Sequence, residues 1–260
     1  MPFLQLNDVR LHFTDAANDA PALVFLHYFG GSALAWEPVI AELREQFRCI
    51  ALDLRGFGDS DTPANRFSVT HYVEDLVALV KTLELRAFTL VGHSIGGKIA
   101  LAYAARQPAD LQSLVLLAPS PLSPEPIADD ERQRAIESHG TREAAQQLLE
   151  KIVAHPLPPT LTARAIDDNL RSSGAAWRAW LEVGSREDLS ALISRIQVPT
   201  LIVSGTADQT ITPEVVRREV SARLTNAHMT LLPNVAHLLP LEAPRAVADL
   251  IRTKSYRIVE

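Results

Sequence analysis

Six short apolar runs, separated by helical patterns, constrain the fold of this chain more than any other feature. The runs are rich in Leu, Val and Ile and do not alternate with polar residues; they lie at 22–27, 49–54, 88–92, 113–118, 200–205 and 228–233. Strands that are buried on both faces have this composition, as in parallel sheets. Apolar residues at helical spacing fill much of the remaining chain, over 32–47, 71–85, 96–107, 213–224 and 244–253. The sequence therefore predicts an α/β fold, a mostly parallel sheet with helices on both faces.

Two segments depart from this alternation. Residues 3–14 alternate apolar and polar side chains around Asn7 and Asp8, which predicts a hairpin. From about Ser120 to Gln197 no stretch predicts a strand, and the prolines of "PSPLSPEP" and "HPLPPT" punctuate amphipathic helical patterns. We expect this segment to form a helical subdomain over the sheet. A few extra helices at the sheet edge are the alternative.

Composition excludes several classes of partner. The net charge is −6 and there is no basic run, which argues against nucleic acid and anionic membrane surfaces. The first residues have neither a basic region nor a long apolar stretch, so they do not predict a signal peptide. A single cysteine, Cys49, allows no internal disulfide. We expect a cytoplasmic protein with no membrane partner.

The motif Gly92-His93-Ser94-Ile95-Gly96 lies where a predicted buried strand meets a helix of small residues. In the G-x-S-x-G arrangement the serine occupies a sharp strand-to-helix turn, with its hydroxyl exposed at the edge of the sheet. The start of the following helix offers free N–H groups and the positive end of the helix dipole. The motif therefore predicts that Ser94 is a nucleophile; a serine N-cap beside a glycine-rich turn is the alternative.

A serine nucleophile needs a base and an acid, which follow it in this order: serine, acid, histidine. His237 lies in the loop after the last predicted strand, at the sheet edge where catalytic groups gather. Asp208 follows the preceding strand and is the preferred acid. Glu125, in the loop after 113–118, and Glu214, at a helix start, are the alternatives.

These motifs together resemble those of the α/β-hydrolase fold superfamily, over nearly the whole chain. The matching stretches are "LHYFGGS", "DLRGFGDSD", "GHSIGG", "GTADQTITP" and "NVAHLLPLEAP", and the wording is most similar to small carboxylesterase-like serine hydrolases. The resemblance implies that residues 1–120 and 191–260 form the core and that residues 121–190 form a helical cap subdomain. It also implies an oxyanion hole made by the backbone N–H groups of Phe29 and Ile95. Tyr28 stands where the family usually carries glycine, and its ring is expected to favour short acyl groups. Trp177 and Trp180 are candidate walls of the substrate pocket.

The predicted function is hydrolysis of carboxylic esters through an acyl-enzyme, with a small-molecule ester or lactone as substrate. Lactone hydrolysis, carbon–carbon bond hydrolysis and cofactor-free perhydrolysis (haloperoxidase chemistry) use the same triad and stay open. A ligand-binding receptor with weak turnover is the alternative from a different class. The motifs imply no metal, because no His, Asp and Cys cluster has ligand spacing, and no cofactor, because "GHSIGG" is not a nucleotide-binding G-x-G-x-x-G.

Overall fold

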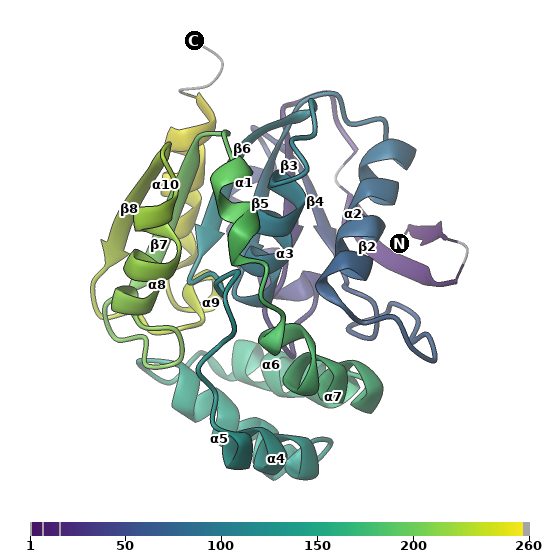
Figure 1. Cartoon of the computed structure of the whole chain (residues 1–260), viewed down its shortest axis with the longest axis vertical. Coiled ribbons are helices and arrows are strands. Elements are labelled where there is room, and N and C mark those ends of the chain that lie inside the picture. Colours follow the sequence, from purple (N-terminus) through teal and green to yellow (C-terminus); the bar gives the residue numbers. More distant parts are fainter. Residues whose placement is uncertain (1, 7, 16, 257–260) are drawn as a thin grey trace.

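The computed structural model describes residues 2–6, 8–15 and 17–256, and its centre is one eight-stranded sheet (Figure 1). The strand order is β1-β2-β4-β3-β5-β6-β7-β8. The strands are β1 (Phe3–Gln5), β2 (Arg10–Asp15), β3 (Ala22–Leu26), β4 (Arg48–Leu52), β5 (Phe88–His93), β6 (Leu111–Leu117), β7 (Thr200–Gly205) and β8 (Ala227–Leu232). The pairings from β3 to β8 are parallel, and those of β1 with β2 and β2 with β4 are antiparallel. The predicted α/β fold with a mostly parallel sheet is confirmed.

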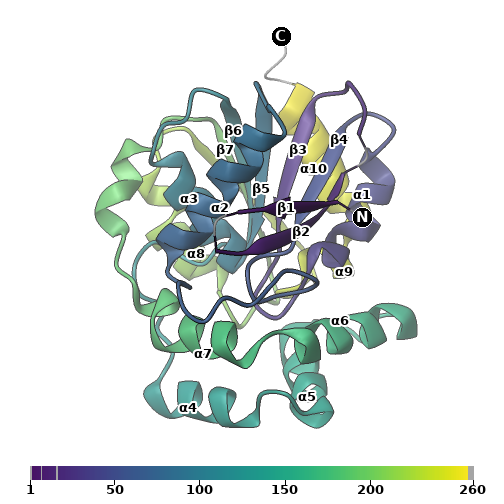
Figure 2. The same ribbon diagram turned by 90° about the vertical axis from the view of Figure 1, so that its right-hand side faces the viewer.

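Helices cover both faces of this sheet (Figures 1 and 2). One face carries α2 (Val69–Thr82), α3 (Ile95–Ala104) and α8 (Pro213–Glu219), and the other carries α1 (Glu37–Leu43) and α10 (Pro244–Tyr256), which the short α9 (Leu239–Glu242) precedes. Successive strand residues point to opposite faces. In β3, Val24 and Leu26 therefore pack with α2 and α3, while Leu23 and Phe25 pack with α1 and α10. Burial on both faces explains the continuous apolar runs of β3 to β7. The run of β8 also predicted a strand buried on both faces, but β8 lies at the edge of the sheet and none of its residues is buried.

Some boundaries differ from those expected. The helix expected over 213–224 ends at Glu219, because Val220 leaves helical geometry (φ −122°, ψ −65°) before a 3₁₀ turn, η4 (Ser221–Arg223). The helix expected over 32–47 is a 3₁₀ turn, η1 (Ala33–Trp36), followed by α1, which has proline in its first turn and ends at Leu43. At the N-terminus β1 and β2 pair with Leu4 opposite Leu11, while Asn7 of the expected turn lies outside the described residues.

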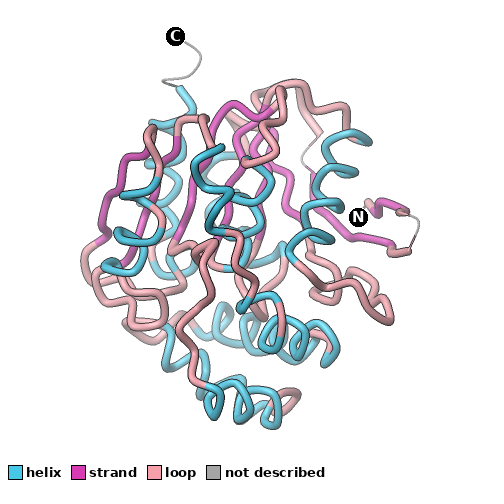
Figure 3. The backbone as a smooth tube through the Cα atoms, in the orientation of Figure 1, coloured by secondary structure: helices cyan, strands magenta, loops and turns pink. Residues whose placement is uncertain are grey.

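Between β6 and β7 the described chain contains only helices and loops (Figure 3). The main helices are α4 (Asp129–Ser138), α5 (Arg142–Ile152), α6 (Pro159–Arg171) and α7 (Gly174–Glu182), followed by the 3₁₀ turns η2 (Gly184–Arg186) and η3 (Ser190–Arg195). Helices α4–α7 lie together beyond one end of the sheet (Figure 2). Among the described residues, no helix combines the length and the apolar character needed to cross a membrane.

Candidate active site

Ser94 occupies the sharp turn between β5 and α3. Its backbone has φ 53° and ψ −115°, a conformation that costs a non-glycine residue free energy. The flanking glycines make the turn possible, because a Cβ on Gly96 would lie 2.4 Å from the carbonyl oxygen of Leu26, and one on Gly92 would lie 2.4 Å from that of Gly96. The glycine spacing in the sequence thus has a steric cause, and the turn presents the serine at the start of α3.

Three loops at the carboxyl edge of the sheet bring Ser94, His237 and Asp208 into one hydrogen-bonded chain. His237 follows β8 and Asp208 follows β7. His237 Nε2 lies 3.0 Å from Ser94 Oγ, and His237 Nδ1 lies 2.8 Å from Asp208 Oδ2. All three side chains are buried, Asp208 completely. The structure therefore brings together the three residues that the sequence predicted as nucleophile, base and acid.

The surroundings of Asp208 select one form of the imidazole. Asp208 Oδ1 accepts hydrogen bonds from the backbone N–H groups of Thr210 (2.8 Å) and Ile211 (3.0 Å), which leaves Oδ2 for His237. Because a carboxylate only accepts, Nδ1 of His237 carries the proton and Nε2 is free to accept one from Ser94. This is the arrangement that general-base activation of a serine requires.

His93, next to the nucleophile, holds the backbone of the histidine loop. Its Nε2 lies 2.7 Å from the carbonyl oxygen of His237, so that it donates to this carbonyl. Burial, together with the neighbouring His237, lowers the pKa of His93 well below 6.5. His93 is therefore a neutral residue that fixes the position of the loop.

The loop after β3 contains Phe29, whose amide was predicted as an oxyanion donor. Tyr28 lies outside the positive-φ region, and Gly30 takes the left-handed conformation instead (φ 81°), so the tyrosine does not strain the loop. Within the described part of the chain, neither the Phe29 amide nor that of Ile95 donates a hydrogen bond to another residue. Both amides are thus available, and Ile95 is the first residue of α3, whose amide has no acceptor within the helix.

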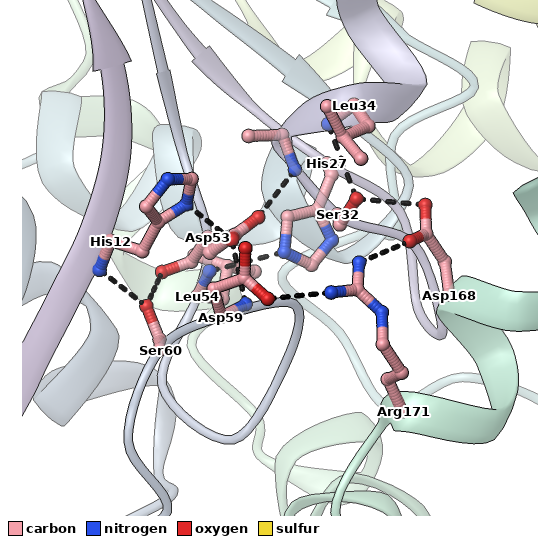
Figure 4. A network of polar contacts seen from close by, with 11 residues as sticks. His12, His27, Ser32, Leu34, Asp53, Leu54, Asp59, Ser60, Asp168 and Arg171 are labelled. Atoms are coloured by element: carbon pink, nitrogen blue, oxygen red, sulfur yellow. Dashed lines mark hydrogen bonds and ion pairs between the residues drawn. The ribbon is translucent and has the colours of Figure 1, made fainter. Parts of the chain in front are cut away.

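A polar network fastens this loop to the sheet and to α6 (Figure 4). His27 Nε2 accepts from the backbone N–H of Leu54 (3.1 Å), while its Nδ1 donates to the carbonyl of Tyr28 (2.7 Å). Ser32 Oγ donates to Asp168 of α6 (2.7 Å). The loop that carries Phe29 therefore has fixed neighbours on both sides.

The predicted pocket residues divide between two places. Trp177 of α7 lies against the Phe29 ring, with 4.1 Å between ring centroids, and Trp180 lies 6.4 Å from the same ring. Tyr28 instead packs in an apolar cluster with residues of α5, α6 and α9, among them Leu149 and Leu241. The tryptophans thus border the loop after β3, whereas the tyrosine ring fills space beneath α5 and α6.

The alternative acids lie elsewhere. Glu214 is in the first turn of α8. Burial raises the pKa of Glu125, although the Ser120 hydroxyl and the charges of Lys98, Arg132 and His237 act in the opposite direction. One Glu125 carboxylate oxygen is buried and has no hydrogen-bond partner among the described residues. Glu125 lies after β6, where the sequence placed this alternative acid, and the charge of His237 acts on its carboxylate.

One group of described residues could offer metal ligands: His12, Asp53 and Asp59 have donor atoms within 4.8 Å of one another. The Asp53 oxygens already accept from His12 Nδ1 (2.7 Å) and from the backbone N–H groups of Ala33 (2.5 Å) and Asp59 (2.8 Å), and Asp59 pairs with Arg171 (2.6 Å) (Figure 4). These contacts satisfy the carboxylates without an ion and act as structural ties.

A family model described as "alpha/beta hydrolase fold" matches residues 21–151, half of the chain. The chain belongs to the α/β-hydrolase fold family. It is similar to the human monoacylglycerol lipase ABHD6 (28% identical, covering 89% of this chain and 74% of that protein). It is also similar to a 2-(acetamidomethylene)succinate hydrolase of Mesorhizobium japonicum (26% identical, covering 89% of this chain and 86% of that protein). The structure of an esterase from Exiguobacterium antarcticum superposes with a TM-score of 0.90 at 22% identity, over 97% of this chain and 98% of that one. As a member of this family, the protein is a hydrolase.

Proposed function

We propose that this α/β hydrolase cleaves carboxylic esters of small molecules through an acyl-enzyme on Ser94. The observation that carries the proposal is the unbroken chain of hydrogen bonds from Ser94 through His237 to Asp208. A serine hydroxyl is a weak nucleophile, and an imidazole with a free Nε2 at 3.0 Å is placed to take its proton.

The reaction has two halves that use the same residues. Ser94 Oγ attacks the ester carbonyl carbon while its proton passes to His237 Nε2, and the backbone N–H groups of Phe29 and Ile95 bind the oxyanion. Collapse of this intermediate breaks the bond to the alcohol, which leaves with the proton from His237. Water then attacks the acyl-enzyme, giving its proton to His237, and the acid leaves as Ser94 is reprotonated. Asp208 keeps the imidazole oriented and stabilises its charged form.

Residues 121–190, which contain α4–α7, are proposed to form a cap subdomain that sets the size of the substrate. Support comes from the contact of Trp177 with the Phe29 ring, because Phe29 contributes one of the proposed oxyanion donors. A side chain of α7 therefore lies directly on the loop where the ester carbonyl would bind. Tyr28 is proposed to limit the same space, because its ring packs in a cluster with residues of α5 and α6 and lies 5.3 Å, between ring centroids, from His93, the neighbour of Ser94.

The experiment compares the wild-type protein with Ser94→Ala on p-nitrophenyl acetate and butyrate. We expect the alanine variant to lose roughly 10⁴–10⁶-fold in kcat with its fold intact, and a fluorophosphonate to label wild-type Ser94 alone. Turnover by the alanine variant at the wild-type rate, or labelling of another serine, would refute the proposal. A wild-type protein that binds esters without turnover would be a receptor. Faster reaction with lactones, with carbon–carbon bonds, or with esters and hydrogen peroxide as the acyl acceptor would assign the same triad to lactone hydrolysis, carbon–carbon bond hydrolysis or perhydrolysis.

A further inference from the structure

The backbone of the His237 loop is held by the cap as well as by the core. The N–H of His237 donates to the carbonyl oxygen of Ile152, the last residue of cap helix α5, at 3.0 Å. On the other side, the carbonyl of His237 accepts from His93. Both peptide groups of the proposed base therefore have fixed partners, and one of these partners belongs to the cap.

A single carboxylate strengthens the connection to the cap. Glu242, the last residue of α9, accepts from the backbone N–H of Leu238 with Oε1 (3.0 Å). Its Oε2 accepts from the N–H groups of Ala236 (3.2 Å) and Ala154 (2.7 Å). Ala236 and Leu238 are the two neighbours of His237, and Ala154 lies just beyond the end of α5. Glu242 thus joins both sides of the base to the segment that connects α5 with α6.

This arrangement matters because the triad depends on small distances. Proton transfer requires Nε2 to stay within hydrogen-bond reach of Ser94 Oγ, and a misplacement of about 1 Å can cost 100-fold in rate. Hydrogen bonds from backbone N–H groups to a carboxylate are charge-assisted and stronger than hydrogen bonds between neutral groups. Glu242 can therefore hold the loop without touching the substrate or the imidazole.

We propose that Glu242 is a positioning residue through which the end of α5, residues 152–154, fixes His237 against Ser94. The inference rests on the proposed role of His237 as the base. Hydrolysis then requires the end of α5 to stay in contact with the His237 loop. A substrate that displaces α5 is hydrolysed with a lower kcat, and its effect is not limited to a higher KM.

The first test is Glu242→Gln. Glutamine has one acceptor oxygen and a donor NH₂, so it cannot accept all three N–H groups. We expect kcat and the rate of fluorophosphonate labelling at Ser94 to fall by about 10–100-fold, with KM changing by less than about threefold, as for a lost bond to a charged group. Measurements are made well below the unfolding temperature of each protein. The matched control is Glu150→Gln, an exposed glutamate of α5 that accepts from Gln146; it should match the wild type.

The second test breaks the connection from the cap side. Ala154→Pro removes the N–H that binds Glu242, and Val153 (φ −113°, ψ 147°) already has a conformation that suits the residue before a proline. We expect at least about a fivefold fall in kcat and in labelling. If Glu242→Gln does not fold, the kcat and labelling rate of Ala154→Pro alone test the inference.

Two outcomes would overturn the inference. Folded variants that label and turn over at the wild-type rate would show that the loop does not need Glu242. A lower unfolding temperature, with kcat unchanged at temperatures well below it, would show that Glu242 has a purely structural role. In both cases the proposed function stands, because wild-type Ser94 is still labelled. A wild-type protein that is neither labelled at Ser94 nor active on esters would refute the proposed function, and the coupling would fall with it.

Discussion

Replacing Asp208 by asparagine should abolish most of the activity, because it changes the tautomer of the His237 imidazole. The Oδ1 position is held by the N–H groups of Thr210 and Ile211, at 2.8 and 3.0 Å, and an NH₂ group cannot take this place. The asparagine NH₂ must therefore face His237 Nδ1, where the carboxylate oxygen stood at 2.8 Å. Nδ1 then has to accept, its proton moves to Nε2, and Nε2 can no longer take the proton of Ser94.

The expected loss in kcat is about 10⁴-fold, the value found when another serine triad is given the wrong tautomer, and it corresponds to about 5.5 kcal/mol of transition-state stabilisation. The assay is hydrolysis of p-nitrophenyl butyrate, with the rate of fluorophosphonate labelling as a second measure. KM should change by less than about threefold, because Asp208 is proposed to act on the histidine and not on the substrate.

Glu125→Gln is the control, since Glu125 is the other carboxylate whose charge acts on His237. It forms no hydrogen bond to the imidazole, and we expect its kcat to stay within about threefold of the wild type. An Asp208→Asn variant that keeps a tenth or more of the activity would refute the tautomer argument. A larger loss in Glu125→Gln than in Asp208→Asn would assign the acid to the loop after β6.

Trp177→Phe should change the ratio of kcat/KM for long and short acyl esters at least about threefold, while the rate at which a small probe labels Ser94 stays nearly constant. A panel of esters of different chain length would measure this ratio, and an unchanged ratio would show that Trp177 does not line the pocket. Tyr28→Phe should keep wild-type kcat/KM, because the hydroxyl bonds to no described residue, whereas Tyr28→Gly should favour longer acyl groups and lower the free energy of unfolding by about 3–5 kcal/mol. Because burial lowers the pKa of His93, the unfolded chain binds a proton below about pH 6.5 that the native protein does not, so stability should fall with decreasing pH by up to about 1.4 kcal/mol per unit. When the free energy of unfolding is measured with urea between about pH 7 and pH 5, it should depend less steeply on pH in His93→Gln than in the wild type, and an equal pH dependence would contradict this.

The sequence was sufficient for features that depend on local pattern. Continuous apolar runs predicted the parallel strands, because the central strands are buried on both faces. The strand order then placed the loops that follow them at one edge of the sheet. The glycines around Ser94 predicted a sharp turn, and the structure shows the backbone contacts that exclude a Cβ at Gly92 and Gly96. Local pattern failed at the end of α8, where Val220 is apolar at helical spacing yet leaves helical geometry.

Only the tertiary structure decided which loops meet. The sequence placed Asp208, Glu125 and His237 after different strands, but the distance between their side chains depends on how each loop packs after its strand ends. The hydrogen bonds from His237 to Ile152 and from Ala154 to Glu242 join residues more than eighty positions apart, and no periodicity records such contacts. Hydrophobic spacing reports whether a residue is buried and on which face of its own element. A hydrogen bond between two loops requires the relative positions of two elements, which the packed core alone fixes.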